Sequence, residues 1–89
     1  MSSNITKVAV IGTGVIGAGW IIRSLAHNKK VFAFDKDIKL KKKLIKEIKR
    51  TWPYVKKLFN KKRLNLNRLK FVDSIKEAVK NADFIQECA

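Results

Sequence analysis

Three glycines near the N-terminus have the spacing of a phosphate-binding turn. The segment GTGVIG, residues 12–17, matches the pattern G-x-G-x-x-G. In this pattern the first glycine permits a tight turn, the second lets the backbone approach a pyrophosphate, and the third lets a helix pack against a strand. Free N–H groups at the start of the following helix bind the phosphates. The predicted cofactor-binding residues of this segment are Gly12, Thr13, Gly14, Val15, Ile16 and Gly17.

A carboxylate follows at the distance that makes this pattern specific. Asp35 lies 18 residues beyond Gly17, at the predicted end of the second strand. An acid at this place accepts hydrogen bonds from the adenosine ribose and repels a 2′-phosphate, which favours NAD over NADP. Lys36 directly after it weakens that repulsion. Three alternatives stay open: a turn without a ligand in which Asp35 caps a helix, a flavin site, and an S-adenosylmethionine site.

A strand, a helix and a second strand must position these residues. Lys7–Ile11 is a short apolar run rich in β-branched residues, typical of a strand that is buried on both faces. Residues 14–27 carry apolar side chains at helical spacing, with Asn28 as a left-handed C-cap. Residues 31–35 form the second buried strand, which ends in the carboxylate.

The pattern that follows predicts a helical arm over about 38–59. One face is apolar and the other is rich in lysine. Pro53 removes a backbone donor and clashes with the preceding turn, so we expect a break or kink near Trp52 and a short second helix after it. A polar connector should follow over 60–67.

The remaining residues predict a third strand, a short helix and a fourth strand. The strands cover 69–72 and 83–87, and Ser74 with Glu77 forms a capping-box signature for a helix that ends near Asn81. The order β-α-β-α-β-α-β implies an α/β, Rossmann-type, doubly wound parallel sheet with strand order 3-2-1-4. We expect a sheet truncated after its fourth strand, so that 1–89 is a partial NAD-binding domain of a longer protein.

The charge is concentrated in one segment. The 89 residues contain 21 Lys and Arg against 7 Asp and Glu, a net charge of +14, and residues 36–70 account for +13 of it. Nucleic acid is an unlikely partner, because that role favours Arg and exposed aromatic rings. A solvated helix face is the preferred interpretation, and contact with an anionic substrate is the alternative. Cys88 is the only cysteine, and no apolar run is long enough to cross a membrane, so we expect a cytoplasmic protein without a membrane partner.

Several segments together resemble the N-terminal part of the 3-hydroxyacyl-CoA dehydrogenase family. These are KVAVIGTGVIGAGW at 7–20, the strand that ends in Asp35, the pair Trp52-Pro53 and ADFIQECA at 82–89. They are most similar to the branch of L-carnitine dehydrogenase and gulonate dehydrogenase (lambda-crystallin). The resemblance implies oxidation of a 3-hydroxy acid or 3-hydroxyacyl-CoA by hydride transfer to NAD. It also implies that Glu87 lies near the nicotinamide.

The resemblance places the catalytic groups outside this chain. The family's catalytic His-Glu pair lies in a later segment, within a separate catalytic and dimerisation domain. His27, the only histidine, is expected at the end of the first helix. We therefore predict no catalytic residue and no metal site in these residues, and a homodimer for the full-length protein. In family members that use coenzyme A, Lys46 would match a lysine that contacts it. The alternative function is a basic nucleic-acid-binding fragment or a non-catalytic nucleotide-binding one.

Overall fold

The core of the molecule is a sheet of four parallel strands. The computed structural model describes residues 5–59 and 64–88. The strand order is β3-β2-β1-β4 and all three pairings are parallel, which confirms the predicted Rossmann-type topology. The strands are β1 (Lys7–Ile11), β2 (Lys30–Phe34), β3 (Leu69–Phe71) and β4 (Phe84–Glu87).

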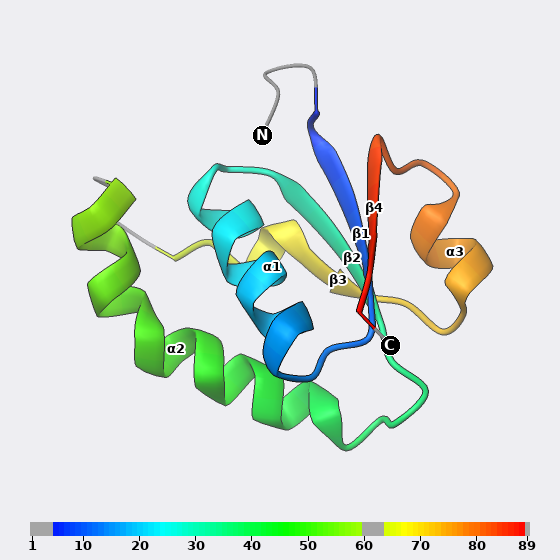
Figure 1. The fold of residues 1–89 in the computed structure, drawn as a ribbon, viewed down its shortest axis with the longest axis horizontal. Coiled ribbons are helices and arrows are strands. Elements are labelled where there is room, and N and C mark those ends of the chain that lie inside the picture. The colour runs from blue at the N-terminus through cyan, green and yellow to red at the C-terminus, as the bar shows by residue number, and fades with distance from the viewer. Residues whose placement is uncertain (1–4, 60–63, 89) are drawn as a thin grey trace.

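Helices cover both faces of this sheet. Figure 1 shows α1 and α2 on one side of the strands and α3 on the other. A short 3-10 helix, η1, leads into β3, where the sequence predicted only a connector; residues 60–63 of that connector lie outside the described residues. The helices are α1 (Val15–Ala26), α2 (Leu40–Phe59), η1 (Leu66–Arg68) and α3 (Ile75–Val79).

The alternating side chains of β1 serve two separate cores. Val8 and Val10 are fully buried among residues of α1 and α2. Ala9 and Ile11 point to the other face, where they pack with Val72 and with Ala78 of α3. A strand that is apolar on both faces belongs at the centre of a parallel sheet. The carboxyl end of β1, where the glycine turn begins, is therefore fixed by packing from both sides.

The first helix ends as the sequence predicts. Asn28 adopts a left-handed conformation with φ of 60°, and its N–H donates to the carbonyl of Leu25 at 3.0 Å. His27 is exposed at this end of α1, and the glycine turn lies at the opposite end of the helix. Ile21 and Leu25 are buried against the sheet, whereas Val15 and Ile16 in the first turn are exposed. The first turn of α1 is therefore apolar but open to solvent.

The predicted break of the arm into two helices is wrong. α2 is one continuous helix of 20 residues with Pro53 inside it, although its ribbon curves towards its C-terminal end in Figure 1. Trp52, which precedes the proline, is 7% exposed and packs in the core with Ile48. The burial of Trp52 offsets the free-energy cost of the backbone hydrogen bond that the proline removes, because tertiary packing outweighs local helix propensity.

Two side-chain interactions fix the far end of the sheet and the short helix. The Oδ2 atom of Asp83 accepts hydrogen bonds from the N–H and hydroxyl of Thr6, each at 3.0 Å, and so joins the starts of β1 and β4. The hydroxyl of Ser74 accepts from the N–H of Glu77 at 3.0 Å, which confirms the predicted cap of α3. Among residues 5–59 and 64–88, no helix is both long and apolar enough to span a bilayer.

Candidate dinucleotide-binding site

The site begins with the tight turn that follows β1. Gly12 has φ of 93°, a conformation that disfavours side chains with a Cβ. Its N–H donates to the carbonyl of Phe34 at 2.8 Å. The turn is therefore tied to the end of β2, the strand that leads into Asp35.

The glycines of the turn differ in what surrounds them. A Cβ on Gly17 would lie 1.8 Å from the carbonyl oxygen of Gly12, so only glycine lets α1 approach the turn this closely. A Cβ on Gly14 would meet nothing within 4 Å, which leaves open space where a pyrophosphate would approach. A Cβ on Gly19 would likewise meet nothing within 4 Å.

The N-terminus of α1 has the electrostatics of an anion site. Gly14 is the N-cap residue and contributes no side-chain hydrogen bond, and the first turn contains no acidic residue. The free N–H groups and the positive end of the helix dipole are thus uncompensated by the protein's own side chains. Val15 and Ile16 are 92% and 69% exposed, so they leave access to the turn. These features fit the phosphates of a dinucleotide.

Asp35 stands beside this turn, held by three hydrogen bonds. Its Oδ2 atom accepts from the N–H of Thr13 at 2.7 Å and from the hydroxyl of Thr13 at 3.2 Å. Its Oδ1 atom accepts from the N–H of Asp37 at 2.8 Å. Partial burial alone would raise the pKa of Asp35, but these hydrogen bonds and the charge of Lys36 lower it below its ordinary value of 3.8. The carboxylate is therefore an anion at neutral pH.

A cavity of about 470 Å³ opens next to the Asp35 carboxylate, between the ends of β2 and β3. Lys41 forms part of its wall and lies over the ring of Phe71, with Nζ 5.2 Å from the ring centroid. The cavity thus combines a carboxylate with apolar and aromatic surface, the combination that a ribose and a purine base require. Its lining residues are Thr13, Phe34, Asp35, Lys36, Asp37, Ile38, Lys41, Phe71, Val72 and Asp73.

A second cavity, of about 400 Å³, lies on the other side of the turn, between α1 and α2. Thr13 lines both cavities. Gly14, Val15 and Gly19 line it from α1, and Lys43 and Glu47 line it from α2. This cavity is mostly apolar.

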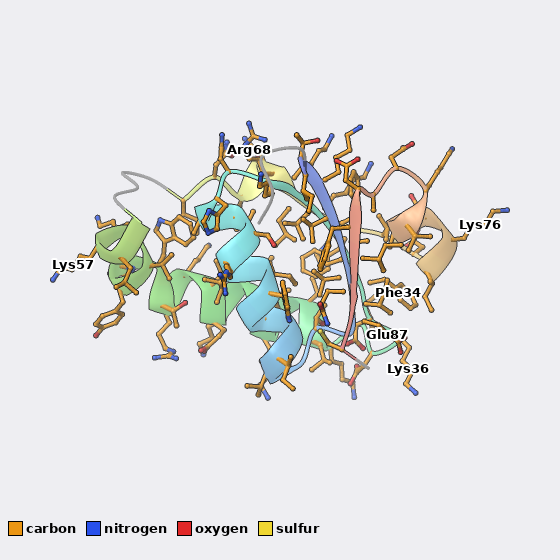
Figure 2. All side chains as sticks on the ribbon, turned by 45° about the horizontal axis from the view of Figure 1, so that its top comes forward. Phe34, Lys36, Lys57, Arg68, Lys76 and Glu87 are labelled. Carbon is orange, nitrogen blue, oxygen red and sulfur yellow. The ribbon has the colours of Figure 1, made fainter. Side chains whose placement is uncertain are left out.

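Glu87 lies at the same edge of the sheet as the turn. It is exposed at the end of β4 and pairs in register with Ile11, the last residue of β1. Figure 2 labels Glu87 with Phe34 and Lys36 at the end of the sheet where the strands finish. All eight residues predicted for the cofactor therefore fall at one edge, which is where ligands bind in open α/β sheets.

Sequence reasoning missed three features of the site. It named Thr13 as a cofactor contact but did not find that Thr13 holds Asp35, and it did not name Lys41 or Phe71. The available signal was the strand order 3-2-1-4, because β1 and β2 are neighbours and the residues that follow them must meet.

The parallel sheet and the site at the carboxyl ends of its strands together define the mononucleotide-binding half of a dinucleotide-binding Rossmann domain. The family model described as "3-hydroxyacyl-CoA dehydrogenase, NAD binding domain" matches residues 7–89. The chain belongs to this family, and NAD is its cofactor. The identification made from the glycine turn, Asp35 and the Trp52-Pro53 pair is confirmed.

Curated relatives and solved structures agree with this assignment. The chain is 52% identical over 81 residues to an L-carnitine dehydrogenase of Oceanobacillus iheyensis, covering 91% of this chain and 26% of that protein. It is 42% identical over 87 residues to an L-carnitine dehydrogenase of Pseudomonas putida, covering 98% and 27%. The structure of 3-hydroxybutyryl-CoA dehydrogenase from Escherichia coli matches with a TM-score of 0.79 at 28% identity, over 97% of this chain and 19% of that one. The chain thus spans about a quarter of the length of these curated relatives.

Proposed function

We propose that this chain is the NAD-binding part of a dehydrogenase that oxidises a 3-hydroxy acid, as L-carnitine dehydrogenase does. One observation carries the proposal: the uncapped N-terminus of α1 and the anionic Asp35 lie at one sheet edge, joined by the turn at 12–14. The identity of 52% to an L-carnitine dehydrogenase supports the substrate class. A 3-hydroxyacyl-CoA is the alternative substrate within the same family.

Different residues of the chain would contact different parts of the cofactor. The N–H groups at the start of α1, with the open space at Gly14, would hold the pyrophosphate. Asp35 and its cavity would hold the adenosine, and Glu87 would lie towards the nicotinamide. NAD supplies the hydride acceptor when it is bound. The chain's own part is to bind the cofactor, orient it and select it by the charge of Asp35.

Three further statements belong to the same proposal. The catalytic and dimerisation functions reside in a domain that complements residues 1–89, the active protein is a homodimer, and its location is the cytoplasm. Oxidation of L-carnitine by the full-length protein, followed by NADH absorbance and compared with a 3-hydroxyacyl-CoA, tests the substrate. Light scattering tests the dimer.

A nucleic-acid role is not favoured. Trp20 stacks on Phe84 with ring centroids 5.8 Å apart, and Trp52 is buried, so neither ring is available to stack on bases. Figure 2 shows Lys57 and Lys76 at opposite ends of the molecule, pointing away from each other. Lys57 and Lys76 therefore do not belong to one groove that a strand could follow.

The test of the cofactor site is the substitution Asp35→Arg. Removing the anion and adding a cation should weaken NADH binding and strengthen NADPH binding, because an Arg at this place accommodates a 2′-phosphate. We expect the ratio of the two dissociation constants to change by at least about tenfold, which corresponds to about 1.4 kcal/mol. Titration calorimetry with both cofactors gives the two constants.

Asp73→Arg is the matched control, because it makes the same change of charge in the same cavity. It should shift the ratio much less than Asp35→Arg. An unchanged ratio in Asp35→Arg would show that this carboxylate does not face the ribose.

A further inference from the structure

The chain contains the same hydrogen-bonded unit twice, at opposite ends of β1. Beyond its carboxyl end, Thr13 donates its N–H and its hydroxyl to one oxygen of Asp35, at 2.7 and 3.2 Å. Before its amino end, Thr6 donates the same two groups to one oxygen of Asp83, each at 3.0 Å. In each unit a threonine beside β1 fixes a carboxylate that belongs to a neighbouring strand. The two units differ in their surroundings.

The unit at the carboxyl end faces one of the two cavities described above, and the unit at the amino end faces neither. Thr13 and Asp35 both line the cavity of about 470 Å³ that would receive the adenosine. Thr13 is 4% exposed, so its hydroxyl is held in place and directed by packing. Thr6 and Asp83 lie at the other end of the sheet and line neither of the two cavities described above.

We infer that Thr13 is a positioning residue for cofactor selection: its hydroxyl fixes the Asp35 carboxylate in the place where it accepts from the ribose and repels a 2′-phosphate. This inference rests on the proposed NAD site. Of the three hydrogen bonds that hold this carboxylate, the N–H groups of Thr13 and Asp37 supply two and the Thr13 hydroxyl supplies the third, the one that depends on the side chain at position 13. Selection between NAD and NADP then depends on the second residue of the glycine turn as well as on the acid.

The same hydroxyl contributes to the lowered pKa of Asp35. Partial burial would raise this pKa, and the N–H groups of Thr13 and Asp37 lower it more than the Thr13 hydroxyl does. The charged groups that face the carboxylate around the cavity are Lys36, Asp37, Lys41 and Asp73.

The experiment compares Thr13→Val, which removes the hydroxyl at nearly constant shape, with Thr13→Ser, which keeps it. Dissociation constants for NADH and NADPH are measured on the full chain by titration calorimetry at pH 7. We expect Thr13→Val to lower the preference for NADH by about tenfold, the effect of losing one hydrogen bond to a charged group. Thr13→Ser should keep the wild-type preference.

Thr6→Val is the matched control, because it removes the equivalent hydroxyl from the other unit. It should lower the melting temperature without changing the cofactor preference. Equal preferences in Thr13→Val and wild type, or an equal loss in Thr6→Val, would overturn the inference while leaving the proposed function intact. If wild type binds neither cofactor, the proposed function fails first and the inference with it. If Thr13→Val does not fold by circular dichroism, Thr13→Ala makes the same comparison with a smaller side chain.

Discussion

At the scale of single residues, the hydrogen atom of Gly17 decides how closely α1 approaches β1. A methyl group there would lie 1.8 Å from the carbonyl oxygen of Gly12, a backbone atom that cannot move without opening the turn. We expect Gly17→Ala to cost at least about 1–3 kcal/mol of unfolding free energy, the usual cost of overpacking, and to abolish measurable NADH binding. Urea denaturation and calorimetry measure the two effects.

Gly19→Ala provides the control for Gly17→Ala on the same helix. A Cβ at Gly19 would meet nothing within 4 Å, so alanine should stabilise the helix by up to about 1 kcal/mol through its higher propensity. The unfolding free energy should therefore fall in Gly17→Ala and rise in Gly19→Ala. A similar loss of stability in both would mean that helix propensity, not contact with Gly12, determines the effect.

Residue types and spacing predicted part of the site, and side-chain geometry supplied the rest. The glycines and Asp35 are visible in sequence because their chemistry depends on spacing along the chain. The hydrogen bond between Thr6 and Asp83 joins residues 77 positions apart, so it depends on which strands are neighbours. The same holds for Thr13 and Asp35. Such pairs become predictable only once strand order and register are known.

At the scale of elements, α2 contains a proline that local rules place at a break. Pro53 is exposed inside the 20-residue helix, while Trp52 beside it is buried. Replacing Pro53 by alanine restores a backbone donor and removes the ring, so it should stabilise the protein by about 1–3 kcal/mol. The midpoint of urea unfolding should rise, and the slope of the unfolding free energy against urea concentration should stay the same.

Tyr54→Ala is the control for Pro53→Ala, because Tyr54 is 71% exposed on the same turn of α2 and keeps its backbone donor. Its effect should stay within about 0.5 kcal/mol, as for most surface positions. A loss of stability in Pro53→Ala would show that the stiffness which proline gives to the unfolded chain outweighs the strain in the helix.

The apolar face predicted for the arm is buried over only part of its length. Leu44, Ile48 and Trp52 are buried. Ile38 precedes the helix and Leu58 lies near its end, and they are 83% and 80% exposed. Periodicity identifies which residues share a face. It does not show how far along the helix the partner surface extends.

At the scale of the whole molecule, strand order and handedness could be predicted because few topologies join short parallel strands by right-handed crossovers. The order β3-β2-β1-β4 follows from that rule and from the doubly apolar β1. Net charge, unlike strand order, follows from composition alone. A net charge of +14 on 89 residues adds self-repulsion that the fold must overcome.

The net positive charge and the two Thr–Asp units both lower the stability of the fold as the pH falls. Hydrogen bonds lower the pKa of Asp83, and in Asp35 they outweigh the opposing effect of burial, so both values lie below the ordinary 3.8 in the folded chain. Their stabilising effect is complete above the ordinary value and is lost as the pH falls through the folded values. Protonation of the carboxylates also raises the net positive charge towards the 21 Lys and Arg plus one His. We therefore expect the melting temperature to fall steeply below about pH 4.

Salt separates these two causes of acid unfolding. Screening at about 0.5 M NaCl weakens the repulsion between exposed charges but leaves the short hydrogen bonds of Asp35 and Asp83 intact. The melting temperature at pH 7 should therefore be higher in salt, and the acid-induced fall should become smaller without disappearing. Asp83→Asn, which cannot titrate at this position, should melt lower at pH 7 and lose less on acidification than wild type. Melting curves that do not respond to salt at either pH would show that repulsion between the exposed charges does not limit the stability of the fold.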